Sequence, residues 1–185
     1  MDALKPDVTS SRYERRVRVN VVAALMFASL VGWAGSAHAA DGCLVLLCLA
    51  APSWQNIAQC VDPVRQVLRD LARGRPFPSC SMSGAGNSAS NQWSSAPGFC
   101  PPQYTRSYEQ ESGTVYACDY SGAVDVNVHG TLWSRTWWSL LGGDTVTEFT
   151  PVAKAQLGVW NTRFEDDYAA WLASLPPAPT ACTSC

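Results

Sequence analysis

The chain has 185 residues, with 13 lysine or arginine and 15 aspartate or glutamate side chains, so its formal net charge is −2. This balance argues against nucleic acid as a partner, because binding to phosphates needs clustered basic residues. Without the N-terminal leader described next, the chain is large enough for one ordinary hydrophobic core.

The first 39 residues have the pattern of a cleavable signal peptide. Four arginines between residues 12 and 18 precede an apolar run, which is shorter than the roughly 20 residues of a membrane-spanning helix. Ala37 and Ala39 supply the small residues that cleavage requires at the −3 and −1 positions. We therefore expect export to the periplasm, a mature chain that begins at Ala40, and no stable membrane span after cleavage.

Two other export routes fit the sequence less well. A lipid anchor on Cys43 would need a small apolar residue where Asp41 stands, and the residues after Arg15-Arg16 match a twin-arginine signal poorly. Ordinary secretion of the unfolded chain is therefore the prediction.

All eight cysteines follow the leader. An even number of cysteines in a short exported chain predicts disulfides. A zinc site is less favoured, because His129 is the one histidine after the leader and no two closely spaced cysteine pairs face each other. We expect no metal and no other cofactor.

The most strongly patterned stretch runs from Cys60 to Cys80 and contains one amphipathic helix. Asp62 and Pro63 are typical of an N-cap and a first helical position, and Gly74 is typical of the residue after a helix end. The buried stripe of this helix has i, i+3, i+4, i+7 spacing and consists of Val64, Val67, Leu68 and Leu71.

Residues 43–50 are apolar and are expected to form a second helix that packs on this stripe. In such an antiparallel hairpin, Cys48 and Cys60 meet at the turn, and Cys43 and Cys80 meet at the open end. Cys43 and Cys48 are not expected to pair with each other, because five residues apart on one helix they point in different directions.

The small, polar residues 81–96 lack an apolar period, which predicts an exposed, mobile loop. Beyond it, residues 114–120 and 123–128 flank Ser121-Gly122 and predict a β-hairpin. Further strands are expected over 132–139 and 145–150. A disulfide between Cys100 and Cys118 would join the entry loop of this sheet to its first strand.

Residues 151–175 predict either one long helix, interrupted only by Gly158, or two helices. Thr162 and Glu165 have the spacing of a capping box for the second of these. Its apolar face consists of Phe164, Tyr168, Trp171, Leu172 and Leu175. Pro176-Pro177 ends the helix, and Cys182 and Cys185 in the tail are expected to pair with each other.

The predicted fold class is α+β, with a disulfide-stapled N-terminal helical hairpin, a small antiparallel sheet and a C-terminal amphipathic helix. The sheet and the C-terminal helix are assigned to the same domain. The expected segments are a signal peptide over 1–39, the hairpin over 40–80, the loop over 81–96, the sheet and helix over 97–175, and the tail over 176–185.

Two motifs invite a catalytic interpretation. Glu165, Asp166 and Asp167, with Asp144 and Glu148 earlier in the chain, raise the possibility of paired-carboxylate glycosidase chemistry. Acids in the first turn of a helix are, however, already explained by the helix dipole. The Cys182-Thr-Ser-Cys185 motif has the spacing of a thiol oxidoreductase but no following helix to stabilise a thiolate. We therefore assign no catalytic residue.

Two groups of residues are candidates for binding a partner. On a strand, Trp133, Arg135 and Trp137 share one face, and interface cores favour tryptophan and arginine. The same tryptophans can instead belong to a core with the C-terminal helix. An arginine ridge consists of Arg65, Arg69 and Arg73, and its alternative explanation is a solvated helix face.

With these residues in view, the chain resembles the TrbM/KikA/MpfK family of conjugal-transfer proteins over roughly residues 40–80. The resemblance rests on Cys43-x4-Cys48-Leu-Ala, on Cys60-x-x-Pro63-Val-Arg, and on Leu71-Ala-Arg-Gly-Arg-Pro-Phe-Pro-Ser-Cys80, behind a signal peptide. It implies a small exported protein of plasmid transfer and type IV secretion, without an established catalytic motif. No active-site residue is carried over.

The resulting functional prediction is a non-enzymatic periplasmic accessory of conjugation that binds an envelope protein of a type IV secretion system. The alternative is an enzyme or binding protein acting on peptidoglycan or another carbohydrate. In that case Glu148 and Glu165 would be the acids and the tryptophans would form a platform for sugar.

The mature protein is expected to begin at Ala40 and to carry no lipid. Intact-mass measurement of the protein from a periplasmic fraction checks both statements. A mass that corresponds to a diacylglyceryl group on Cys43 would show that the chain is a lipoprotein instead.

Overall fold

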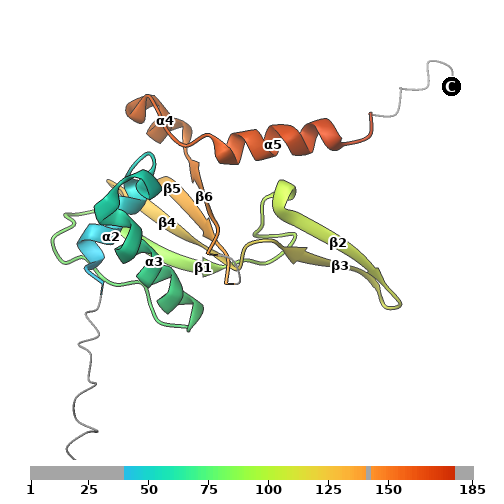
Figure 1. The fold of residues 1–185 in the computed structure, drawn as a ribbon, viewed down its shortest axis with the longest axis horizontal. Coiled ribbons are helices and arrows are strands. Elements are labelled where there is room, and N and C mark those ends of the chain that lie inside the picture. Colours follow the sequence, from blue (N-terminus) through green and yellow to red (C-terminus); the bar gives the residue numbers. More distant parts are fainter. Residues whose placement is uncertain (1–39, 141–142, 178–185) are drawn as a thin grey trace, which may run out of the picture. The chain divides into compact units, whose positions relative to one another are not determined.

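The computed structural model describes residues 40–140 and 143–177, so the predicted signal peptide and the Cys182–Cys185 pair lie outside the described residues. The described chain has the predicted α+β fold, with helices and a small antiparallel sheet (Figure 1). Within these ranges, no helix combines the length and the apolar character that crossing a membrane would require.

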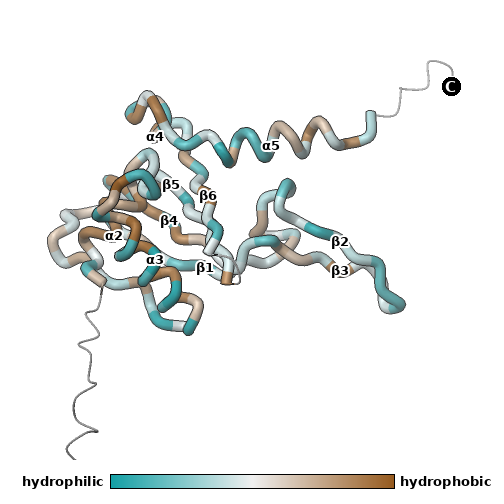
Figure 2. The backbone as a smooth tube through the Cα atoms, viewed as in Figure 1, coloured by the Kyte–Doolittle hydropathy of each residue, from teal (hydrophilic) through white to brown (hydrophobic). Residues whose placement is uncertain are grey.

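The N-terminal part is the predicted helical hairpin. Helix α2 spans Gly42–Ala50, a short 3₁₀ helix η1 spans Trp54–Asn56, and helix α3 spans Ala58–Ala72. The side chain of Asp41 caps α2 by accepting a hydrogen bond from the backbone N–H of Cys43 over 2.9 Å. The brown colour of the backbone tube in Figure 2 marks the apolar residues of α2, and their side chains pack on the predicted stripe of α3.

The described residues contain three disulfides: Cys43–Cys80, Cys48–Cys60 and Cys100–Cys118. They are the pairings that the hairpin geometry and the sheet entry loop predict. At the open end of the hairpin, α2 lies so close to the returning chain that a Cβ atom on Gly42 would stand 2.3 Å from the carbonyl oxygen of Ser79. Position 42 therefore requires glycine, next to the Cys43–Cys80 disulfide.

Helix α3 begins earlier than predicted. Its N-cap is Ile57, and Asp62 and Pro63 lie inside the helix instead of at its start. The added turn contains Cys60, whose disulfide to Cys48 ties it to α2. Pro63 has no backbone N–H, so it cannot donate a hydrogen bond to the carbonyl four residues before it. The longer helix therefore lacks one of its backbone hydrogen bonds.

The C-terminal end of α3 is as predicted. Gly74 has a φ of 76°, and its N–H bonds to the carbonyl of Leu71 over 2.8 Å. The N–H of Arg75 bonds to the carbonyl of Asp70 over 3.0 Å. These two bonds form the Schellman arrangement that ends many helices.

The sheet has four antiparallel strands in the order β1-β4-β5-β6. The strands span Ser88–Trp93, Gly122–Val128, Thr131–Trp138 and Thr145–Phe149 for β1, β4, β5 and β6. Val124, Val126 and Trp138 pack in one apolar cluster with α2 and α3. Ala123 and Trp137 pack in a second cluster with Tyr104 and Tyr120. The sheet therefore separates two cores.

The predicted loop over residues 81–96 contains strand β1, so this prediction is wrong for its second half. Asn91 accepts a hydrogen bond from the indole N–H of Trp138 over 2.9 Å, and the ring of Trp93 meets that of Trp138 edge-on at 5.4 Å. The strand is at the edge of the sheet, where backbone pairing with β4 forms it without an apolar alternation in sequence.

The predicted hairpin around Ser121-Gly122 is also wrong. Strand β3, Gly113–Cys118, pairs with β2, Thr105–Gln110, in a separate two-stranded sheet. Strand β4 turns instead into β5 through His129 and Gly130, whose φ values of 52° and 77° suit a two-residue hairpin. Gly122 serves close packing, because a Cβ there would stand 2.7 Å from the carbonyl oxygen of Gln92.

The C-terminal segment forms two helices. Helix α4 spans Pro151–Leu157 and helix α5 spans Arg163–Ser174, and they are separated at Gly158, whose φ is 72°. The predicted capping box is wrong, because the side chain of Thr162 makes no capping hydrogen bond. The carboxylate of Glu165 pairs instead with Lys154 of α4.

Removal of the disulfide at the open end of the hairpin, by Cys43→Ser with Cys80→Ser, is expected to lower the free energy of unfolding by about 3–4 kcal/mol, since this bridge closes a loop of 37 residues. Urea unfolding of the purified protein measures this. The control, Cys182→Ser with Cys185→Ser, should change stability far less. Equal losses in the two variants would contradict the expectation.

Candidate functional site

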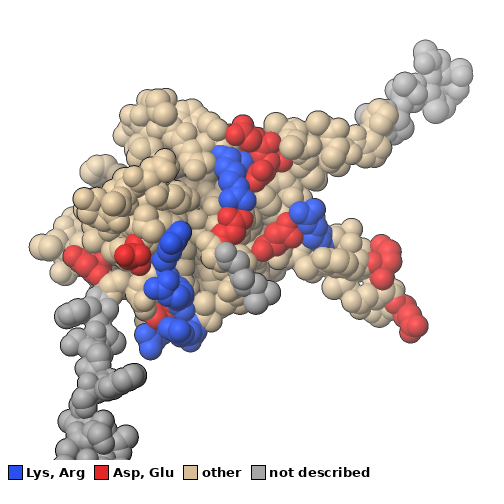
Figure 3. All heavy atoms as spheres, in the orientation of Figure 1, with Lys and Arg blue, Asp and Glu red and all other residues tan. Residues whose placement is uncertain are grey.

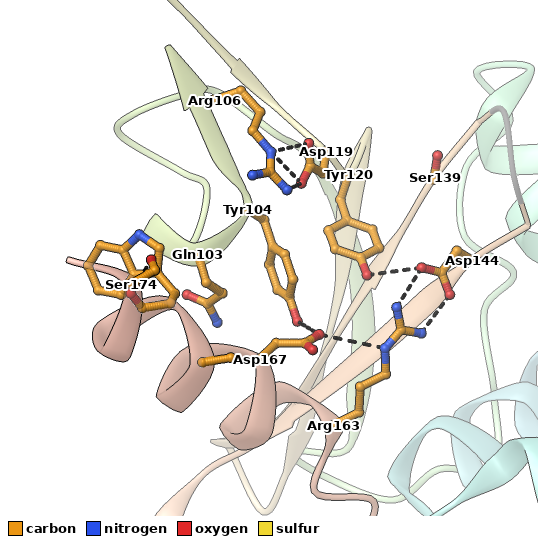
Figure 4. A pocket seen from close by; sticks show the side chains of 12 residues that line it. Gln103, Tyr104, Arg106, Asp119, Tyr120, Ser139, Asp144, Arg163, Asp167 and Ser174 are labelled. Atoms are coloured by element: carbon orange, nitrogen blue, oxygen red, sulfur yellow. Dashed lines mark hydrogen bonds and ion pairs between the residues drawn. The ribbon is translucent and has the colours of Figure 1, made fainter.

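A cleft of about 460 Å³ lies between α5 and the base of the β2–β3 hairpin, and we call it the α5 cleft (Figure 4). The 3₁₀ helix η2, Pro102–Tyr104, and the adjoining ends of β2 and β3 supply one side. Helix α5 supplies the other. Polar and aromatic side chains line the cleft, among them Gln103, Tyr104, Arg106, Asp119, Tyr120, Asp144, Arg163, Asp167 and Trp171.

Two tyrosines and one arginine connect the carboxylates in this cleft. The hydroxyl of Tyr104 donates to Asp167 over 2.7 Å, and the hydroxyl of Tyr120 donates to Asp144 over 3.3 Å. Arg163 binds Asp144 through both terminal nitrogens, over 2.7 and 2.8 Å, and its Nε lies 3.6 Å from Asp167. Figure 4 shows the continuous network that results.

The network shifts the pKa values of its members in opposite directions. Burial raises the pKa of Tyr104, and the hydrogen bond to Asp167 raises it further. Burial and the negative charge of Asp144 raise the pKa of Tyr120. The hydrogen bonds from Arg163 lower the pKa of Asp144. Near neutral pH the tyrosines are therefore protonated donors and Asp144 is an ionised acceptor.

The outer part of the α5 cleft has a second arginine–carboxylate pair. Arg106 donates to both oxygens of Asp119, at 2.7 to 3.1 Å. Near it, Gln103 is only 7% exposed, and neither its amide nitrogen nor its amide oxygen has a hydrogen-bond partner among the described residues. A buried carboxamide without partners costs free energy, so its presence calls for an explanation.

A neighbouring cavity of about 420 Å³ is lined by Arg135, Trp137 and Glu148. Arg135 donates to both oxygens of Asp125 over 2.6 and 2.9 Å and lies over the ring of Phe99, 4.8 Å from its centroid. Burial raises the pKa of Glu148, and the positive charge of Arg135 opposes the shift. Arg135 is therefore a structural cation held between an acid and an aromatic ring.

The structure does not bring Trp133, Arg135 and Trp137 together on one exposed face, as was expected. Trp137 is 2% exposed and belongs to the second core, whereas Trp133 packs against the first. The cause is a β-bulge, because Leu132 pairs with Asn127 and Ser134 pairs with Val126, which leaves Trp133 as an extra residue. The alternative explanation, a core shared with the C-terminal helix, fits Trp137, which packs in one cluster with Phe164, but not Trp133, which packs with the helical hairpin.

The two glutamates considered as catalytic acids do not line one cavity. Glu148 lines the cavity beside Arg135, while both carboxylate oxygens of Glu165 are buried at its ion pair with Lys154. Paired-carboxylate chemistry needs two carboxyl groups that flank one substrate bond. Of the other acids considered, Asp144 and Asp167 belong to the α5 cleft, and Asp166 accepts a hydrogen bond from Thr162.

The arginine ridge Arg65, Arg69 and Arg73 is exposed on α3, where Figure 3 shows basic side chains gathered. Arg73 and the neighbouring Arg75 share Asp70, at 3.6 and 3.0 Å, and Arg69 bonds to the neutral side chain of Gln66. The ridge therefore has an excess of positive charge, whereas Arg106, Arg135, Arg163 and Lys154 each have an acidic partner.

Sequence reasoning did not predict the α5 cleft. Gln103, Tyr104 and Arg106 lie in a stretch without periodic pattern, and Tyr120 appeared only as a strand residue. Arg163, one residue after the expected cap, carried no signal of its own. Their meeting depends on how η2 and α5 pack on the sheet. The proximity of Asp144 to the acids of α5, considered from sequence, is the one element of the site that was anticipated.

Comparison of the chain with protein-family models, with curated proteins and with solved structures gave no match.

The tyrosine network predicts sensitivity to alkaline pH. Both folded-state pKa values are raised, so the stability they contribute is fully present below the unfolded tyrosine pKa of about 10 and is lost as the pH rises above it. Urea unfolding at about pH 8 and about pH 11 measures the free energy of unfolding. Between these pH values it should fall further in the unmutated protein than in the double variant Tyr104→Phe with Tyr120→Phe.

The matched control is Tyr116→Phe, because Tyr116 is 48% exposed on β3. This variant should keep the full alkaline loss. If the double variant also kept the full loss of stability at alkaline pH, the two buried tyrosines would not be the source of that loss.

Proposed function

We propose that this protein is an exported, non-enzymatic accessory of plasmid conjugal transfer that binds another envelope protein of a type IV secretion system. The resemblance of residues 40–80 to the conjugal-transfer family supplies the process. Disulfides are typical of proteins that fold outside the reducing cytoplasm, and the six cysteines within the described residues are all paired. Both features support the proposal without depending on each other.

The observation that carries the binding role is the exposed apolar face of α5. None of the residues of this helix is fully buried. Tyr168 and Leu172, at its apolar side, are 41% and 47% exposed, and Leu175, which directly follows the helix, is 45% exposed. They follow helical spacing, so they form one stripe, which we call the α5 stripe. An amphipathic helix of this kind is suited to lie in an apolar groove of a partner protein.

Two further surfaces suit a protein partner. The β2–β3 hairpin exposes nearly all of its residues, including Tyr108 at 54% and Tyr116 at 48% (Figure 1). As a two-stranded sheet, it has backbone groups on both edges that can pair with an added strand. The arginine ridge, on another element, complements an acidic segment. The partner that fits is therefore a protein with an apolar groove and acidic side chains.

The test uses donor cells that lack the gene and are complemented with variants. Tyr168→Ala with Leu172→Ala should weaken partner binding by about 30-fold, the effect expected for loss of about 2 kcal/mol at an interface centre. Transfer frequency should fall, and envelope proteins should no longer co-purify with the variant. Immunoblots of the periplasmic fraction and circular dichroism check that the variant is exported and folded.

The control removes apolar side chains elsewhere that are even more exposed: Leu47→Ala with Met82→Ala, at positions 70% and 84% exposed. It should transfer normally. Normal transfer and unchanged co-purification in the α5 variant would contradict the proposed binding role.

A further inference from the structure

We propose that the α5 cleft binds a glycan built from N-acetylated amino sugars, the chemistry of the peptidoglycan backbone. This activity goes beyond the protein binding described above. It also uses different residues of α5, since Asp167 and Trp171 line the cleft whereas Leu172 and Leu175 do not.

The charges of the cleft favour a neutral ligand. Two arginines face three aspartates there, and Arg106 and Arg163 are each already bound to a carboxylate by two or more hydrogen bonds. An anion would have to displace these carboxylates, and the third aspartate, Asp167, already accepts a hydrogen bond from Tyr104 and lies 3.6 Å from Arg163. The volume of about 460 Å³ is within the range of small-ligand sites, roughly 300–1,000 Å³.

The same ion pairs suit a ligand rich in hydroxyl groups. A guanidinium group has five N–H donors, and the bonds of Arg106 to Asp119 use its Nε and one terminal nitrogen. Pairing with Asp119 fixes the plane of this group, so its remaining donors have defined directions. The ring of Trp171, which also lines the cleft, offers an apolar surface for the C–H face of a sugar.

Gln103 points to an N-acetyl group as part of the ligand. Its side chain extends from η2 toward α5 in Figure 4, and its buried carboxamide has no hydrogen-bond partner in the part of the chain that the structure describes. A carboxamide is both a donor and an acceptor, as is the acetamido group of an N-acetylated sugar. A sugar with only hydroxyl groups lacks this amide, and the site would discriminate against it by leaving the carboxamide unpaired.

Isothermal titration of the mature chain with the trisaccharide of N-acetylglucosamine, and with the trisaccharide of glucose as comparison, tests the ligand class. The first should bind at least about tenfold more tightly, which corresponds to about 1.4 kcal/mol. Absence of binding of the first, or equal binding of both, would overturn the proposal. Binding of an extended peptide at the cleft in place of either sugar would overturn it as well.

Substitutions of single residues test whether the glycan binds in the α5 cleft. Trp171→Ala and Gln103→Met should each weaken binding of the N-acetylated trisaccharide by about tenfold or more. Trp93→Ala, which removes a tryptophan that is 48% exposed on β1, should leave binding unchanged. Unchanged binding in Trp171→Ala or in Gln103→Met would overturn the assignment to this cleft.

Gln103→Met has a second readout that a structural role would not give. The substitution removes a buried carboxamide without partners and keeps nearly the same volume, so the melting temperature should rise by about 2–4 °C while binding is lost. A lower melting temperature with unchanged binding would instead show that Gln103 serves packing. Loss of glycan binding in Trp171→Ala with normal partner binding, and the reverse in Tyr168→Ala with Leu172→Ala, separates this proposal from the proposed function.

Discussion

The position of the helical hairpin on the sheet depends on how the C-terminal end of α2 is satisfied. The last carbonyls of a helix have no partner within the helix, and at a buried end they need one from elsewhere. Strand β5 supplies two: the indole N–H of Trp133 donates to Ala50 over 2.9 Å, and the hydroxyl of Ser134 donates to Leu49 over 3.0 Å. The β-bulge at Trp133 lets adjacent residues of one strand reach the same helix end.

The alternation of side chains along β5 then divides the interior. Trp138 is 1% exposed and packs with the hairpin, while its neighbour Trp137 is 2% exposed and packs on the opposite side of the sheet. The second side is where Tyr104 and Tyr120 meet, with their rings edge-on at 4.8 Å. The Cys100–Cys118 disulfide holds the chain before η2 next to the end of β3. The α5 cleft is thus built on the second core.

The parts of the fold that could be predicted are those in which residues that contact each other are close in sequence and follow a recognisable spacing. The stripe of α3, the end of that helix at Gly74 and the hairpin disulfides all follow from spacing within about forty residues. Strand β1 could not be predicted, because an edge strand is formed by backbone bonds to β4 and needs no apolar alternation. Ser121-Gly122 resembled a turn, but Gly122 is small so that β1 and Trp138 can approach it.

The candidate site could be predicted least, because its members come from η2, from the β2–β3 hairpin, from the chain before β6 and from α5. Helix α5 has 12 residues and buries none of them fully, so it would be marginal as an isolated helix. Phe164 is its apolar anchor in the second core, and polar contacts to other elements are made by Arg163, Glu165 and Asp167.

Exposed ion pairs stabilise a fold by about 1 kcal/mol at most. The bond between buried Tyr104 and Asp167 is therefore a more important polar link than the pair of Arg163 with Asp144, in which both side chains are nearly half exposed. A helix held in this way leaves its remaining surface for other molecules, and the α5 stripe and the α5 cleft lie on adjacent faces that meet where the ring of Tyr168 contacts that of Trp171.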